Sequence, residues 1–165
     1  MRKYLPAGPN ALVWIVTVSL VAVLALLLAL AGGIKSMPVS AAIVLYAVSG
    51  VVALALAVGW LARPIRYEVG DDTVCIVRSW PFAKITLPRS KIKGTRHVTL
   101  EAVLPASVVV VGVFGYAGRF RNPELGNFLL YATSTANTVL INADETYVIS
   151  PANPKRFMHD LSGRK

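Results

Sequence analysis

The sequence predicts a two-helix transmembrane hairpin followed by a small all-β domain of antiparallel strands that ends in one helix. Two long apolar runs near the N-terminus predict the hairpin. About seven short segments rich in β-branched and aromatic residues, separated by turn residues, predict the β domain. A short amphipathic segment near the C-terminus predicts the last helix. The chain therefore divides into a hairpin, residues 1–62, and a domain, residues 63–165.

The two apolar runs are Ala11–Ala31 and Val39–Ala62, and neither contains a charged residue or a histidine. A helix rises about 1.5 Å per residue, so about 20 residues cross the ~30 Å hydrocarbon core of a bilayer. Both runs reach that length. The link Gly32–Pro38 is so short that it can join only antiparallel neighbours.

Flanking charges predict the orientation of the hairpin. Arg2 and Lys3 precede the first run and Arg63 and Arg66 follow the second, whereas the link contains only Lys35. Segments rich in lysine and arginine stay on the cytoplasmic side of a membrane. Both termini are therefore expected in the cytoplasm.

A signal peptide is the alternative for the N-terminal segment, with Ala29-Leu30-Ala31 as its cleavage site. The apolar part of such signals is about 7–15 residues long, shorter than the first run. Cleavage would leave the second span and the location of the domain unchanged.

Small residues recur at helical spacing in both spans and predict a close contact between the two helices. The alternative is a seam for dimerisation. These residues are Ala25, Ala29, Gly33, Ser49, Ala53 and Ala57.

The expected strands follow one another along the domain, and Gly70-Asp71-Asp72 forms the turn of the first hairpin. A C-terminal helix is expected over Lys155–Leu161, with Asn153 as its N-cap and Pro154 at its first position. The expected strands are Ile65–Val69, Thr73–Trp80, Ala83–Leu87, Ile92–Leu100, Gly126–Thr133, Thr138–Ala143 and Thr146–Ser150.

The uncharged stretch Ala102–Ala117 does not fit this scheme, because Pro105, Gly112 and Gly115 interrupt it. We expect a buried strand with a glycine-rich bend. The alternative is a loop that dips into the membrane face beneath the domain.

Seven strands and one C-terminal helix are the pattern of a pleckstrin homology (PH) barrel. The chain resembles bacterial membrane-anchored proteins with a PH-like domain over about Arg66–Leu161. The resemblance implies a PH-like barrel with a C-terminal capping helix in the bacterial plasma membrane, and it implies no activity. It is carried by Gly115–Gly126 (GYAGRFRNPELG), Tyr131–Thr133, Asn137–Ile141, Tyr147–Pro151 and Phe157.

One basic stretch is the candidate binding site. PH domains that bind phosphoinositides hold the phosphates with basic residues in the first hairpin loop, which is acidic here. Five of the basic residues between Asp72 and Glu101 could instead contact anionic lipid headgroups, or they could form an ordinary solvated face. They are Lys84, Arg89, Lys91, Lys93 and Arg96.

The sequence offers little for catalysis. His97, His159 and the single Cys75 are far apart, and the two acidic pairs, at residues 71–72 and 144–145, occupy turns. We therefore expect no enzyme activity, no cofactor and no metal. The net charge of +9 would permit nucleic-acid binding. We do not expect a nucleic-acid partner, because the domain is tethered at a bilayer.

Two functions from different classes remain. The first is a membrane-anchored scaffold that binds a protein partner, or a second copy of itself, at the cytoplasmic face. The alternative is an electrostatic sensor of anionic lipid headgroups that uses the stretch Lys84–Arg96.

Overall fold

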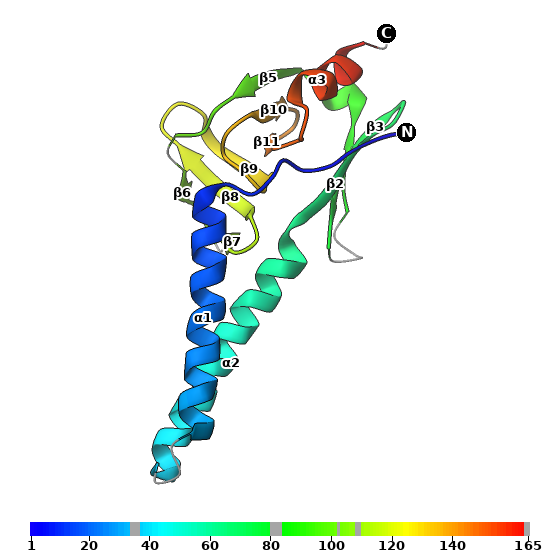
Figure 1. Cartoon of the computed structure of the whole chain (residues 1–165). Coiled ribbons are helices and arrows are strands. Elements are labelled where there is room, and N and C mark those ends of the chain that lie inside the picture. Colours follow the sequence, from blue (N-terminus) through cyan, green and yellow to red (C-terminus); the bar gives the residue numbers. More distant parts are fainter. Residues whose placement is uncertain (34–36, 80–83, 102, 108–109, 164–165) are drawn as a thin grey trace.

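The structure, a computed structural model, describes residues 1–33, 37–79, 84–101, 103–107 and 110–163. Two long helices extend side by side from one end of a β domain, and both chain termini lie at the domain (Figure 1). The expected fold class is confirmed: two apolar helices, a β domain and a C-terminal helix follow one another along the chain. Lys35, the predicted charge of the link, lies outside the described residues.

Helices α1 (Ala11–Gly33) and α2 (Val39–Ala62) are both long and apolar enough to cross a membrane. A core helix of a soluble protein would bury most of its side chains. Here only four are buried: Val13 and Thr17 in α1, and Ser49 and Gly59 in α2. The exposed apolar surface indicates a membrane location.

The contact between the helices differs from the predicted small-residue seam. Large side chains at helical spacing are half-buried, among them Leu20, Leu24 and Leu27 in α1. Ser49 is buried, but the other five predicted seam residues are exposed. The helices separate toward the domain (Figure 1), and a turn of the domain contacts both of them there.

The first sheet has the order β1-β2-β3-β4 and is antiparallel throughout. The predicted hairpin forms, with the Gly70 amide donating to the Thr73 carbonyl at 2.8 Å. The predicted strand ends at Trp80 and Ala83 lie outside the described residues. The strands are β1 (Arg2–Tyr4), β2 (Pro64–Val69), β3 (Thr73–Arg78) and β4 (Ile85–Pro88).

The second sheet has the order β5-β10-β11-β9-β8-β6, with β7 also pairing with β8. It departs from the expected antiparallel pattern at one place, because β11 and β9 are parallel. Its strands are β5 (Gly94–Val98), β6 (Leu104–Pro105), β7 (Val110–Val111), β8 (Tyr116–Asn122), β9 (Gly126–Ala132), β10 (Thr138–Asn142) and β11 (Thr146–Ile149).

Helix α3 (Pro154–Ser162) covers the core between the sheets. It begins as predicted: the Arg156 amide donates to Oδ1 of Asn153 at 3.1 Å, and Pro154 is the first helical residue. Phe157 is fully buried, and its ring lies 5.2 Å from that of Tyr4 and 6.5 Å from that of Tyr67.

The N-terminal segment is part of the domain. Strand β1 adds to the edge of β2, and the Ala7 amide donates to the Ser150 carbonyl at 2.7 Å. Asn10 then caps α1, accepting from the Val13 amide at 3.0 Å. Residues before the first span therefore complete a sheet of the domain instead of forming a free tail.

Asp160 on α3 holds this segment in place. Its carboxylate accepts hydrogen bonds from the Arg2 guanidinium and the Tyr4 hydroxyl. These two donors, Arg2 first, lower the pKa of Asp160 from 3.8 to about 2. The ionised carboxylate is therefore the form that binds β1.

The stabilisation from Asp160 should depend on pH. A lowered pKa in the folded state stabilises fully above the unfolded value, near 4, and the contribution is lost as the pH falls toward about 2. Asp160→Asn should therefore lower the thermal midpoint of the full chain in detergent at pH 6, and this deficit should shrink at pH 2.5. The control is Asp144→Asn, which alters an exposed ion pair. A deficit of equal size at both pH values would contradict the role of the carboxylate charge.

The stretch 102–117 has the expected glycine-rich bend, at Gly112 and Gly115, but its described strands β6 and β7 are not buried as expected. Residues 102 and 108–109 lie outside the described residues, and Val110–Val111 forms a two-residue strand. The turn that follows lies against both helices: Thr17 Oγ1 donates to the Gly112 carbonyl at 3.2 Å and accepts from the Phe114 amide at 3.1 Å. The Phe114 ring packs edge-on against Trp60 of α2, with ring centroids 5.2 Å apart.

Candidate functional site

Of the five basic residues of the candidate site, Lys84 directly precedes β4, Arg89 and Lys91 lie on the 3-10 turn η1 (Arg89–Lys91), Lys93 directly precedes β5, and Arg96 lies on β5. These elements follow one another along one border of the two sheets. The five side chains differ in the partners that they bind.

Lys84 and Arg89 have structural partners. Lys84 Nζ lies 3.6 Å from the Glu68 carboxylate, which is almost fully buried and also binds Arg66 at 2.7 Å. The Arg89 guanidinium donates to the Gly70 carbonyl at 3.1 Å, and to the carbonyls of Asp160 and Leu161 in the last turn of α3. Arg89 therefore ties the first hairpin to the C-terminal helix.

Lys91 forms an ion pair with Asp144, with 2.5 Å between Nζ and Oδ2. The hydrogen bond to Asp144 raises the pKa of the Lys91 amine. Both side chains are exposed, and exposed pairs of this kind contribute little to stability.

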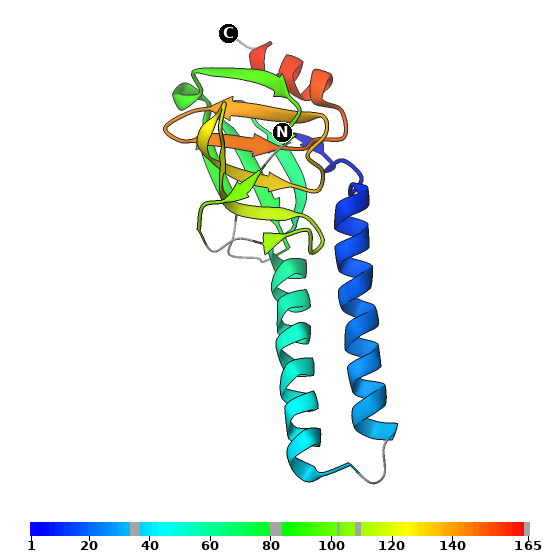
Figure 2. The same cartoon turned by 90° about the vertical axis from the view of Figure 1, so that its left-hand side faces the viewer.

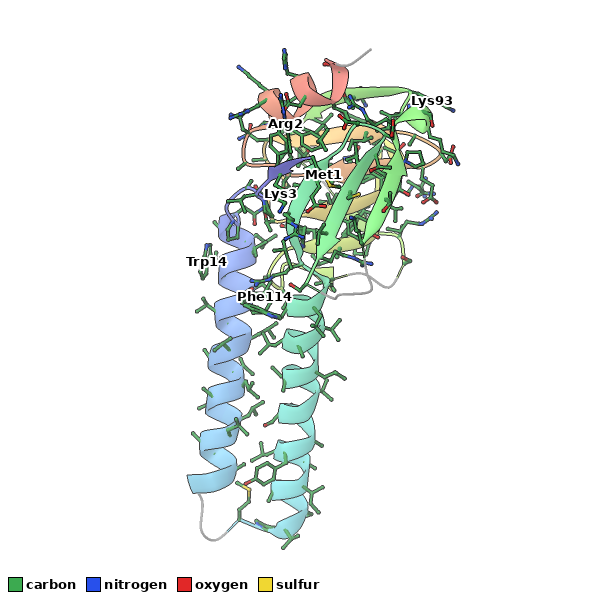
Figure 3. All side chains as sticks on the ribbon, turned by 90° about the vertical axis from the view of Figure 1, so that its right-hand side faces the viewer. Met1, Arg2, Lys3, Trp14, Lys93 and Phe114 are labelled. Carbon is green, nitrogen blue, oxygen red and sulfur yellow. The ribbon has the colours of Figure 1, made fainter. Side chains whose placement is uncertain are left out.

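Lys93 and Arg96 are exposed, and no described residue pairs with either charge. Strand β5 lies at the end of the domain opposite the helices (Figure 2), and Lys93 lies at that same end (Figure 3). These two cations thus lie at the end of the domain opposite the hairpin.

Strand β5 offers a second feature that the sequence did not locate. It pairs with β10 from Gly94↔Asn142 to Val98↔Thr138, and no other described strand pairs with its outer edge. An edge strand leaves alternate amide and carbonyl groups free to bond with an added strand. Arg96 and His97, both exposed, lie on it, and α3 packs beside it. We call Lys93–Val98 the β5 edge.

The acidic first-hairpin turn does not form a cationic cradle. It borders a cavity of about 180 Å³ that Arg2 and Arg89 also line. Both guanidinium groups are engaged there, Arg2 with the Asp160 carboxylate and Arg89 with backbone carbonyls. The described residues contain no cluster of three or more histidine, cysteine or acidic side chains that could hold a metal ion.

A family profile described as Bacterial PH domain matches residues 65–165. The match covers the sheets from β2 onward and α3, and it begins just after α2. Comparison with curated proteins and with solved structures gives no match to this chain.

Proposed function

The chain belongs to the bacterial PH domain family, and from this membership we propose that it is a non-enzymatic, membrane-anchored module that binds a protein partner through the β5 edge. PH-like domains are typically non-catalytic. The partner is an extended segment that adds as a strand, a mode of recognition in which main-chain hydrogen bonds give affinity.

The open edge of β5 is the observation that carries this proposal. Most other edges are shorter or occupied: β1 covers β2, and β6 has two residues. Strand β4 has four residues and ends in a proline, which has no amide hydrogen to donate. With five residues, β5 is the longest of the described strands at the end of a sheet.

Charge indicates the chemistry of the partner. Lys93 and Arg96 lie along the β5 edge without an ion-pair partner among the described residues, and the exposed Lys155 and Arg156 begin the adjacent α3. An acidic segment complements this surface and is steered toward it. Self-association through two β5 edges would place like charges opposite each other, which destabilises paired strands. A different protein therefore fits better than a second copy.

Photo-cross-linking in cells tests the proposal. A photoreactive residue at His97 should give a protein adduct, and one at Arg121, an exposed cation on β8, should not. The double substitution Lys93→Glu and Arg96→Glu should abolish the His97 adduct, whereas Arg121→Glu should leave it unchanged. Equal adducts at both positions, or none at His97, would reject the β5 edge.

Anionic lipid is the alternative ligand of the same basic residues. The full chain in phosphatidylcholine nanodiscs would then bind phosphatidylglycerol liposomes, and it would lose them at high salt as the Debye length falls from ~10 Å at 0.1 M to ~3 Å at 1 M. Such binding without a protein adduct would favour the lipid sensor. The position of Lys93 opposite the helices supports the protein partner, because this end faces away from the bilayer that anchors the chain.

We further propose that the domain and both termini lie in the cytoplasm. The basic residues Arg2, Lys3, Arg63 and Arg66 flank the domain-proximal ends of the helices. In a Cys75→Ser background, an impermeant thiol reagent should label Met37→Cys in intact cells but not Ser162→Cys. Labelling of Ser162→Cys alone would reverse the orientation.

A further inference from the structure

A cavity of about 550 Å³ lies where the two helices meet the domain. The segment before α1 forms one wall, the first turns of α1 another, and the start of β2 a third, with Phe114 between the helices. Its volume falls within the ~300–1,000 Å³ of small-ligand sites. We call it the junction cavity. It is separate from the β5 edge, which lies at the other end of the domain.

The lining of the junction cavity is mainly apolar and open to the surroundings of the helices. Leu5, Trp14 and Ile65 line it and are exposed by 72%, 59% and 41%. Trp14 projects from α1 near the level of Phe114 (Figure 3). Such surface is costly in water but suits a hydrocarbon chain.

One residue with a charged side chain, Arg63, is among the lining residues of the junction cavity. Arg63 follows α2 directly; its Nε donates to Ser79 Oγ at 3.3 Å, and its guanidinium carbon lies 3.4 Å from the centre of the Trp60 ring. No acidic residue is among the lining residues. The other polar side chains there, Thr17 and Thr133, already have hydrogen-bond partners within the protein.

From this combination we propose that the junction cavity binds one anionic phospholipid, with an acyl chain against the apolar lining and the headgroup phosphate at Arg63. Arg63 lies at the domain-proximal end of an apolar span, the depth at which headgroups meet a bilayer. Basic pockets between membrane helices on the cytoplasmic side bind such headgroups. A phosphate oxygen suits the fixed fork of guanidinium donors. The inference requires the hairpin to span a membrane, but it does not depend on the β5 edge or its partner.

Native mass spectrometry of the full chain in detergent tests this site. After delipidation, titration with phosphatidylglycerol should give one dominant adduct, and phosphatidylcholine should bind at least several-fold more weakly. Arg63→Gln should weaken phosphatidylglycerol binding about ten- to a hundredfold, the range expected for losing a charge-assisted hydrogen bond. The control is Lys3→Gln, which removes an exposed cation close in sequence to the lining segment before α1 but not itself a lining residue. This variant should bind phosphatidylglycerol as the wild type does.

A second pair of variants tests the cavity at a residue other than Arg63, and thermal midpoints check that each variant is folded. Ile65→Glu places an acid in the lining and should abolish the adduct, whereas Leu104→Glu, at a residue exposed by 60% that does not line the cavity, should not. Unchanged thermal midpoints would show that each variant is folded. A ladder of adducts without headgroup preference, or preference retained in both Arg63→Gln and Ile65→Glu, would overturn the proposal.

Discussion

Phe157→Ala is expected to lower the free energy of unfolding by about 3–5 kcal/mol, as truncation of a buried phenylalanine does. The ring is fully buried between the two sheets and packs edge-on against Tyr4 and Tyr67. Its loss leaves a cavity at the point where α3, β1 and β2 meet. Chemical unfolding of the full chain in detergent, followed by near-ultraviolet circular dichroism, measures the change.

Arg156→Ala is the matched control for this prediction. Arg156 is exposed on the same helix, and a surface substitution of this kind changes stability by no more than about 0.5 kcal/mol. Phe157→Ala falling within 1 kcal/mol of the control would show that α3 does not close the core. The full chain is needed because Tyr4, a neighbour of Phe157, belongs to the segment before the first span.

Elements with strong local signals could be predicted from the sequence. The spans follow from length and hydropathy, and α2 has the predicted bounds, Val39–Ala62. The first hairpin follows from its turn residues, and the start of α3 from Asn153 and Pro154. Each of these signals lies within a few residues of the element that it predicts.

Strands β1 and β8 were not predicted, because their partners are distant or their composition is unfavourable. Strand β1 has three residues, and it becomes a strand only by pairing with β2, more than sixty residues later. Strand β8 contains Gly118 and three polar or charged residues, which disfavour a strand. Tertiary pairing with β9 along seven residues overrides this propensity.

The candidate site could be predicted only as a set of charges. Composition does not show that Lys91 meets Asp144, 53 residues away, or that Arg89 binds the end of α3. Sequence periodicity predicted a strand around β5 but not its place at the edge of a sheet. The junction cavity is also invisible in the sequence, because four separate segments contribute its walls.

Gly59→Leu is expected to disturb the contact that fixes the domain on the hairpin. A Cβ at Gly59 would lie 2.8 Å from Cβ of Val113 and 3.0 Å from its carbonyl oxygen, so neither atom could stay in place. Gly112, in the left-handed region with φ of 74°, brings the same turn against Val16 of α1. The turn is thus wedged between the helices, and a larger residue at Gly59 must displace it.

The expected loss in the free energy of unfolding is about 1–3 kcal/mol, as for overpacking of a closed contact. Replacing glycine within a helix gains up to about 1 kcal/mol of helix propensity, so the clash must exceed that gain. Gly50→Leu isolates the propensity term, because a Cβ at Gly50 on the same helix meets nothing within 4 Å. Thermal unfolding of both variants in detergent should show Gly59→Leu less stable than the wild type and Gly50→Leu no less stable. Equal midpoints for the two variants would mean that the turn is not held by α2 and that other contacts fix the domain on the hairpin.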